Sequence, residues 1–282
     1  LLDEKLETTF AGRLAGGLVA NTACAAAQLG LQVGWSGYLG DDDFAQVVLE
    51  DFARFGVDSR YAVKVEGANS DFTVILLTPG GERTILIVSN FAELPLTEEV
   101  LKALSFSRLG YALPRVSEWF ERFSRAVRSG GGQVVVDVEG SCPVRGADLD
   151  FALCNSDIAF LSRDGLRLAT GVDSLENGVQ RLLKTGLQAV IVTLGASGAL
   201  APTENEVCQH PAFRVPVVDT TGAGDCFHAA FLVGWLEGWE LRRCLRFASA
   251  AAALSVQALG ARGGLPDYST VERFLDQHGE EA

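Results

Sequence analysis

The sequence predicts an α/β protein of three layers, in which helices cover both faces of a mostly parallel β-sheet, with a small β-sheet insertion. Three observations lead to this prediction. Apolar β-forming runs alternate with helix-periodic runs over most of the 282 residues. Residues 58–88 break the alternation with short β-runs and no helix between them. The length is ample for one large α/β core that carries such an insertion.

Composition excludes several classes of protein. The formal net charge is −13 and no Lys/Arg cluster offsets it, which argues against nucleic acid or an anionic membrane as a partner. No apolar run reaches the length of a membrane span and no signal peptide opens the chain, so we expect a cytoplasmic protein. The six cysteines lack any Cys-x-x-Cys pair and are predicted to be reduced core residues.

The first elements are read from periodicity and end signals. In order, we predict a strand at 8–10, a helix at 22–29, a strand at 32–38 and a helix from 44 to 56. The helix from 44 to 56 follows an acidic turn and ends at Gly56. Strands that alternate with helices in this way indicate parallel pairing.

The insertion is predicted to be a small antiparallel unit. Its strands are expected at 61–65, 72–78 and 84–88, and the turn Pro79-Gly80-Gly81-Glu82 joins the last two as a hairpin. We assign residues 1–14 and 58–88 to this unit and residues 15–57 and 89–282 to the core. Arg83 lies on the hairpin, where we expect it either to contact an acidic or phosphorylated substrate or, as is commoner for such a residue, to face solvent.

The α/β alternation then continues to the end of the sequence. Helices are predicted at 97–103, 116–127, 162–170, 175–185, 226–236, 241–259 and 268–277, and strands at 108–112, 134–138, 157–161, 189–193 and 199–201. The triplet Gly130-Gly131-Gly132 follows a helix and precedes a strand, so we interpret it as a helix stop and not as a phosphate loop.

The most informative stretch runs from Val217 to Asp225. Val217-Val218 predicts a strand, and a small-residue loop then leads into an apolar helix. Backbone N–H groups in the first turn of a helix lack intrahelical partners and lie at the positive end of the helix dipole, so Gly222, Ala223 and Gly224 suit a bound phosphate. Asp225 beside them suits a base that takes a proton from a hydroxyl. The alternative is that Asp225 caps the helix and the glycines only permit a turn.

The run Asp219-Thr220-Thr221-Gly222-Ala223-Gly224-Asp225 resembles the Asp-Thr-x-Gly-Ala-Gly-Asp signature of the ribokinase-like (PfkB) carbohydrate kinases. The resemblance implies a ribokinase-like three-layer α/β/α fold with a β-sheet lid. It also implies ATP-dependent phosphorylation of a primary hydroxyl of a sugar or sugar-like substrate. In that family the Gly-Ala-Gly segment is the anion hole and the closing Asp is the general base. Similarity extends in order from Gly16 to Pro266.

Two further segments match the family. Gly16, Gly17 and Asn21 are similar to its amino-terminal signature, which implies contacts with sugar hydroxyls; glycines allow close backbone approach, and an amide both donates and accepts. A helix cap with a packing asparagine is the alternative. Ribose-specific members often carry Lys after the glycines, whereas this chain has Leu18, so the sugar stays open.

The nucleotide side is expected at Thr193-Leu194-Gly195-Ala196-Ser197-Gly198. The family places a Thr-x-Gly-x-x-Gly turn here, against the phosphates and ribose of ATP, so Thr193, Gly195, Ser197 and Gly198 are expected to bind ATP together with Gly224. A hairpin turn without a ligand is the alternative. The small residues of 248–253 either let adenine lie on their helix or only permit close helix packing.

The resemblance also implies ions and a partner. Mg²⁺ is expected to neutralise the phosphates, but the family's Asn-x-x-Glu motif aligns with Ser162 and Gly165 and is therefore missing. Asp219 and Thr221, with the loop at 260–266, imply a K⁺ site. A homodimer is expected through the β lid.

One departure keeps other functions open. The family begins with a central strand that carries a sugar-binding Asp, and the 15 residues before Gly16 contain no such strand, which we read as a truncation or a natural loss. The alternatives are a non-catalytic relative that acts as a binding protein, and a nucleoside or vitamin kinase of the same fold. ADP release on a panel of sugars, nucleosides and vitamin alcohols discriminates among them.

Overall fold

A six-stranded sheet forms the centre of the molecule. The computed structural model describes residues 7–10, 12–77, 83–91, 94–202 and 207–279. The strands of the sheet are β5 (Leu109–Ala112), β6 (Gln133–Val138), β7 (Ile158–Ser162), β8 (Ala189–Thr193), β9 (Ala199–Pro202) and β10 (Val207–His210). Their order is β10-β9-β8-β7-β6-β5; β5 to β8 are parallel, and the other two add antiparallel pairs at one edge. The mostly parallel sheet is therefore confirmed.

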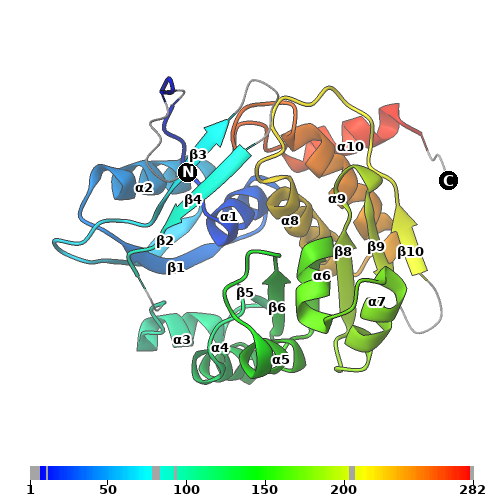
Figure 1. Cartoon of the computed structure of the whole chain (residues 1–282), viewed down its shortest axis with the longest axis horizontal. Coiled ribbons are helices and arrows are strands. Elements are labelled where there is room, and N and C mark those ends of the chain that lie inside the picture. The colour runs from blue at the N-terminus through cyan, green and yellow to red at the C-terminus, as the bar shows by residue number, and fades with distance from the viewer. Residues whose placement is uncertain (1–6, 11, 78–82, 92–93, 203–206, 280–282) are drawn as a thin grey trace.

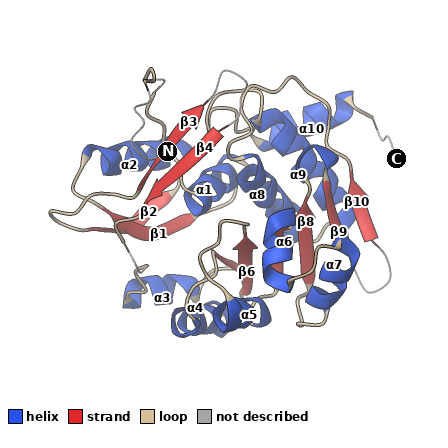
Figure 2. Ribbon diagram, viewed as in Figure 1, coloured by secondary structure: helices blue, strands red, loops and turns tan. Residues whose placement is uncertain are grey.

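Helices cover both faces of this sheet (Figures 1 and 2). One face packs against α1 (Leu18–Gln28), α8 (Ala223–Leu236), α9 (Leu241–Ser255) and α10 (Tyr268–Gln277). The other face packs against α4 (Ser117–Ser129), α5 (Gly146–Cys154), α6 (Arg163–Thr170) and α7 (Leu175–Leu183). Neighbouring β6 residues supply both cores, since Val135 belongs to the first and Val136 to the second. Strands buried on two faces explain the continuous apolar runs of the sequence.

A second, two-stranded sheet contains β1 (Gly34–Leu39) and β2 (Asp58–Lys64), which are parallel. The prediction that the second of these strands belongs to an antiparallel insertion is therefore wrong. The physical reason is α2 (Asp43–Phe55), which connects the two strands and returns the chain to the end at which it began, as a parallel pair requires.

The hairpin of the insertion is confirmed. β3 (Phe72–Leu77) pairs antiparallel with β4 (Arg83–Val88), and Figure 1 shows this pair apart from the central sheet. The predicted turn at 79–82 lies outside the described residues. At its base, Asp42 accepts hydrogen bonds from the Ser70 backbone N–H (2.7 Å) and hydroxyl (2.8 Å), which fastens the hairpin to the start of α2.

Capping residues fix several helix ends where the sequence predicted them. Asp42, Ser162 and Asp267 each accept a backbone hydrogen bond at a helix start, and Gly56 and Gly171 end α2 and α6 in the left-handed conformation. α3 (Glu98–Leu104) starts at a Thr97 cap in the same way. In the described chain no helix is long and apolar enough to span a bilayer.

Other expectations were wrong. The predicted strand at 8–10 is an irregular segment, and the Phe10 side chain is exposed, so no sheet edge pairs with it. α5 and β10 were not predicted. The helix predicted to reach residue 259 ends at Ser255, because the carbonyl of Val256 instead accepts hydrogen bonds from the N–H groups of Val218 (2.8 Å) and Asp219 (3.2 Å).

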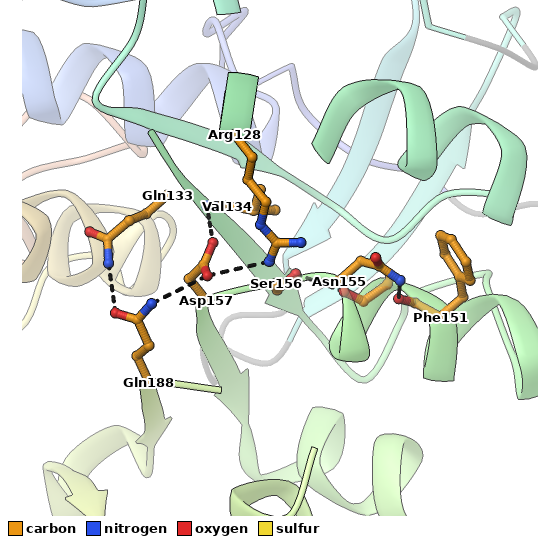
Figure 3. Close-up of polar contacts among 9 residues, drawn as sticks. Arg128, Gln133, Val134, Phe151, Asn155, Ser156, Asp157 and Gln188 are labelled. Carbon is orange, nitrogen blue, oxygen red and sulfur yellow. Dashed lines mark hydrogen bonds and ion pairs between the residues drawn. The ribbon is translucent and has the colours of Figure 1, made fainter. Parts of the chain in front are cut away.

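The amino-terminal edge of the parallel strands is closed by a polar network around Asp157 (Figure 3). This carboxylate accepts from the Val134 N–H (2.7 Å), from Gln188 Nε2 (3.3 Å) and from Arg128 (3.3 Å). Gln188 in turn accepts from Gln133 Nε2 at 2.8 Å. These bonds tie β6, β7 and β8 together at one end. In open α/β sheets, ligands generally bind at the opposite edge, where the carboxyl ends of the strands lie.

Candidate active site

The glycine-rich loop leads directly into α8. Gly222 has φ 77° and precedes the first residue of the helix. A Cβ at Gly222 would lie 2.7 Å from Ala261 Cβ, so this position requires glycine for packing as well as for its backbone angle. Gly224, by contrast, has open space around its Cα. The Ala223 N–H donates to the Thr220 carbonyl oxygen at 3.3 Å, and the open surface of the first turn lies beside Gly224.

The predicted strand before this loop is not formed. Val217 and Val218 are exposed and irregular, since their segment pairs with the end of α9 and not with a strand. Asp219 organises the turn: its Oδ1 accepts from the Thr221 N–H (2.9 Å) and hydroxyl (2.7 Å). Its Oδ2 accepts from the Gly260 N–H at 2.9 Å. The carboxylate of Asp219 thus joins the glycine-rich loop to the turn after α9.

Asp225 lies in the first turn of α8 and its side chain is buried, with 4% of the residue exposed. Asn21 Nδ2 donates to Asp225 Oδ2 at 2.8 Å. Burial raises the pKa of Asp225 to about 8; the hydrogen bond from Asn21 opposes this rise, the carboxyls of Asp137 and Glu139 add to it, and the charge of Arg262 opposes it. A carboxyl with a pKa near neutrality is suited to accept a proton from a hydroxyl.

A second buried polar cluster lies close to Asp225. The Tyr111 hydroxyl donates to Asp137 Oδ2 (2.9 Å) and lies 3.0 Å from His228 Nδ1. His228 is on α8, three residues after Asp225, and burial lowers its pKa to about 4, so the ring is neutral. Burial raises the pKa of Asp137 to about 7. Among the described residues of this cluster the basic side chain is His228, and because its ring is neutral the cluster does not offset the charge of Asp225.

The carboxyl ends of three adjacent strands meet beside this cluster. Glu139 follows β6, Ser162 ends β7 and Thr193 ends β8, and Ser162 pairs with Thr193 in the sheet. Burial is the main cause that raises the pKa of Glu139, and the nearby carboxyls of Asp137 and Asp164 add to it. The Ser162 hydroxyl oxygen accepts from the Gly165 N–H at 3.0 Å. A Cβ at Gly165 would lie 1.7 Å from the Val138 carbonyl oxygen, so no glutamate fits where the family motif has one. Glu139 supplies a carboxylate at this edge from the neighbouring strand.

The turn expected to bind the nucleotide follows β8. Gly195–Ser197 forms a short 3₁₀ turn whose residues are exposed, and Gly195 has a positive φ with open space around it. Gly198 has a different reason to be glycine, because a Cβ there would lie 2.0 Å from the His210 carbonyl oxygen. Thr193, Gly195 and Ser197 are thus accessible at the carboxyl edge of the sheet, whereas Gly198 packs against β10.

The di-glycine segment lies on the other side of Asp225. Gly16 and Gly17 are exposed and precede α1, which carries Asn21. Arg262 donates from Nε to Asn21 Oδ1 (3.0 Å) and from Nη2 to the Gly16 carbonyl (2.8 Å). Asn21 therefore contacts Asp225 and Arg262 at once. Arg83 begins β4, and its side chain lies outside the described part of the molecule.

Sequence reasoning missed several residues of this site, namely Tyr111, Glu139, His228 and Arg262. Each is a polar residue within an otherwise apolar or glycine-rich run. Such a residue could have indicated a buried polar contact, because charged and aromatic polar groups are rarely buried without a partner. This signal does not say which residues the polar groups contact. His228 contacts Tyr111 and Arg262 contacts Asn21, and each of these partners lies more than a hundred residues away in the chain.

Comparison with known proteins identifies the family of the chain. The family model described as pfkB family carbohydrate kinase matches residues 6–268. The chain belongs to this family. It is therefore a carbohydrate kinase, and the ribokinase-like fold expected from the glycine-rich signature is confirmed.

Several relatives resemble this kinase over most of its length. It is 31% identical to a ribokinase of Arabidopsis thaliana over 93% of this chain and 72% of the relative. It is 27% identical to a deoxyribokinase of Salmonella typhi, over 92% and 87% respectively. It is also 28% identical to a 5-dehydro-2-deoxygluconokinase of Clostridium perfringens, over 94% and 85%.

Solved structures give the same family. The structure of Arabidopsis thaliana ribokinase complexed with ribose and ATP matches with a TM-score of 0.84 and 29% identity, over 97% of this chain and 92% of that one. A fructokinase from Xylella fastidiosa with bound ATP matches with a TM-score of 0.80 and 26% identity, over 95% and 92%.

Proposed function

We propose that the protein transfers the γ-phosphoryl group of ATP to a primary hydroxyl of a sugar or sugar-like substrate. The observation that carries the proposal is Asp225, a buried carboxyl with a raised pKa, in the first turn of α8 beside the open backbone of Gly224. A base and an anion-binding helix start adjoin each other there, as phosphoryl transfer requires.

The chemistry assigns one role to each part. Asp225 takes the proton of the sugar hydroxyl while the hydroxyl oxygen forms a bond to the γ-phosphorus. The bond between that phosphorus and the oxygen bridging to the β-phosphate breaks, which leaves ADP. The N–H groups of Gly222, Ala223 and Gly224 stabilise the negative charge on the transferred group, and the helix dipole of α8 adds to this.

ATP is proposed to lie along Thr193, Gly195, Ser197 and Gly198, with its terminal phosphate at Gly224. The accessible turn after β8 supports this, as do the ATP complexes of two relatives. Mg²⁺, when bound, neutralises the phosphates. Mg²⁺ needs only one or two protein carboxylates beside phosphates and water, and Glu139 with Asp164 fits that need; the described residues form no cluster of three or more metal-binding side chains.

A K⁺ site at Asp219 and Thr221 stays part of the proposal. The Asp219 carboxylate already accepts three hydrogen bonds that hold the loop. A monovalent cation bound there would therefore act on the anion hole through the loop that Asp219 organises.

The sugar is proposed to lie near Gly16, Gly17 and Asn21, with the hairpin of β3 and β4, which begins its second strand at Arg83, above it as a lid. Because β2 pairs with β1, residues 58–64 belong with the core and not with this lid, and residues 7–10 form no strand of it. Lid closure excludes water and so protects the phosphoryl group from hydrolysis. Relatives named ribokinase, deoxyribokinase and 5-dehydro-2-deoxygluconokinase support a sugar substrate. A relative named aminoimidazole riboside kinase, 30% identical over 93% of this chain, supports the nucleoside-like alternative.

The proposal is tested by ADP release from the purified protein with ATP and Mg²⁺ on a panel of pentoses, hexoses, keto-sugar acids, nucleosides and vitamin alcohols. Release with a sugar is expected, and replacement of K⁺ by Na⁺ in the same assay tests the cation. Activity confined to nucleosides or vitamin alcohols would overturn the substrate class. ATP binding without release on any member would favour the non-catalytic alternative.

We propose further that two copies pair through the hairpin. Ile75, Ile85 and Ile87 share one face of it, and Val74, Leu86 and Val88 share the other, and all six are exposed. Only one of these apolar faces can cover the sugar. A second copy of the same hairpin would cover the other face and bury apolar surface that is otherwise in contact with water.

Replacing Ile87, which is 66% exposed, by Lys is expected to convert a dimer into a monomer, because the charge would be buried at the interface. Sedimentation equilibrium measures the mass. Phe106→Lys is the matched control, since Phe106 is 81% exposed and belongs to the segment after α3, not to the hairpin. A wild-type protein that is monomeric at all concentrations tested, or an unchanged Ile87→Lys dimer, would contradict the proposed interface.

A further inference from the structure

Arg262 is an unusually buried cation close to the proposed base. It lies in the turn between α9 and α10, and only 5% of it is exposed. Each of its three nitrogens has an acceptor: Nε donates to Asn21 Oδ1 (3.0 Å), Nη1 to Asp51 Oδ2 (3.1 Å) and Nη2 to the Gly16 carbonyl (2.8 Å). A guanidinium with all three nitrogens engaged is held in a single orientation.

These contacts connect segments that are distant in the chain. Gly16 precedes α1, Asn21 is on α1 and Asp51 is on α2. The turn that carries Arg262 is itself held to the glycine-rich loop, through the Gly260 N–H to Asp219 bond and the contact of Gly222 with Ala261. Arg262 therefore lies where the proposed sugar loop and the proposed anion hole meet.

Arg262 determines which way the Asn21 amide points. A guanidinium has only N–H donors, so the amide must present its oxygen to Arg262. The NH₂ group then faces Asp225, to which it donates at 2.8 Å. That bond engages Oδ2 of Asp225, whereas Oδ1 has no hydrogen-bond partner among the described residues. Oδ1 is thus the oxygen left to accept a proton.

Arg262 also acts on Asp225 by its charge. The titratable groups that act on Asp225, or on which it acts, are Tyr111, Asp137, Glu139, Cys226 and Arg262. Burial and the two carboxyls raise the pKa of Asp225, while Asn21 and Arg262 lower it. Arg262 is the cation in this set. Its removal is therefore expected to raise the pKa of Asp225 further, because less charge then opposes the effect of burial.

We infer that Arg262 is a positioning residue for the phosphoryl-transfer reaction: through Asn21 it orients the Asp225 carboxylate, and it helps to keep that carboxylate ionised. This inference rests on the proposed role of Asp225 as the base. It gives Arg262 a function beyond its ion pair with Asp51, which by itself would only stabilise the fold.

The test compares Arg262→Met with Asp51→Asn. The first removes the charge and the bond to Asn21, and the second removes only the ion pair. Arg262→Met is expected to move the acid limb of the kcat profile upward by about 0.5–1 pH unit, less than an adjacent opposite charge produces. The rate at pH 7 then falls about three- to tenfold and recovers toward pH 9. Asp51→Asn is expected to lower Tm but to leave the acid limb in place.

A measurement that needs no turnover separates this inference from the proposed function. The ¹³C-carboxyl resonance of Asp225, assigned by its loss in Asp225→Asn, is titrated in wild-type protein and in Arg262→Met. A higher pKa in the variant supports the inference even if no panel substrate is phosphorylated. Equal titration midpoints, or an equal shift in Asp51→Asn, would overturn it. If Arg262→Met does not fold, Arg262→Lys, which keeps the charge without the three-way fork, is titrated instead and is expected to give a smaller shift of the same sign.

Discussion

Asp225→Asn is expected to lower kcat by about 10²–10⁴-fold, the contribution typical of a general base. The amide that replaces the carboxylate has the same shape but cannot take the hydroxyl proton. Its oxygen still accepts from Asn21, so the first turn of α8 and its N–H groups stay in place. The affinity for ATP, measured by calorimetry, is therefore expected to be unchanged while ADP release is nearly lost.

Asp157→Asn is the matched control for this substitution. Asp157 is also a carboxylate with little exposed surface, but it lies at the amino-terminal edge of the sheet, in the network of Figure 3. Its loss is expected to reduce stability and to leave kcat of the folded fraction near the wild-type value. Full turnover in Asp225→Asn would rule out Asp225 as the base.

The rate is expected to rise with pH, because Asp225 must be ionised to act. With its pKa raised to about 8 by burial, only about a tenth of the maximal rate is expected at pH 7. A kcat profile from pH 5.5 to 9.5 with saturating ATP and sugar measures the acid limb. A profile that is flat across this range would contradict a titrating base of this kind.

Protein stability has the opposite pH dependence. The pKa of Asp225 is higher in the folded protein than the ordinary value of 3.8, so between these two values the folded state holds a proton that the unfolded state releases. Stability therefore falls as pH rises from about 4 to about 8. Asp225→Asn lacks this penalty, and its unfolding free energy should exceed that of wild type by on the order of 1–3 kcal/mol at pH 8 and by little at pH 4. Urea titrations at pH 4.5, 6 and 8 measure the difference.

Local signals in the sequence predicted much of the fold. α10 has its predicted bounds because Asp267 caps it, and α6 lies between the Ser162 cap and the left-handed Gly171. α5 was missed because it begins at a glycine after Arg145, without a capping side chain. The prediction of a strand at Val217-Val218 was wrong for a different reason. β-forming residues form a strand only where the edge of another strand is available for pairing.

The candidate site likewise has one part that the local sequence predicted and one part that it did not. The glycine-rich loop and Asp225 are contiguous in the chain, so their pattern was visible in the sequence. The contacts that modify Asp225 are not contiguous: Asn21 and Arg262 are separated from each other by 241 positions. A long-range polar network of this kind follows from how the helices pack, and no local spacing encodes it.

The helix that carries Asp225 has a further consequence. Every residue of α8 from Asp225 to Gly234 is buried, whereas the hairpin of β3 and β4 exposes both of its faces. Backbone amides of α8 beyond its first turn are therefore expected to exchange their hydrogens only when most of the molecule unfolds, whereas the two-stranded hairpin is expected to open on its own. Under the proposed function, the hairpin is therefore expected to open and close over the sugar many times during the lifetime of the folded core, while the proposed base stays in place.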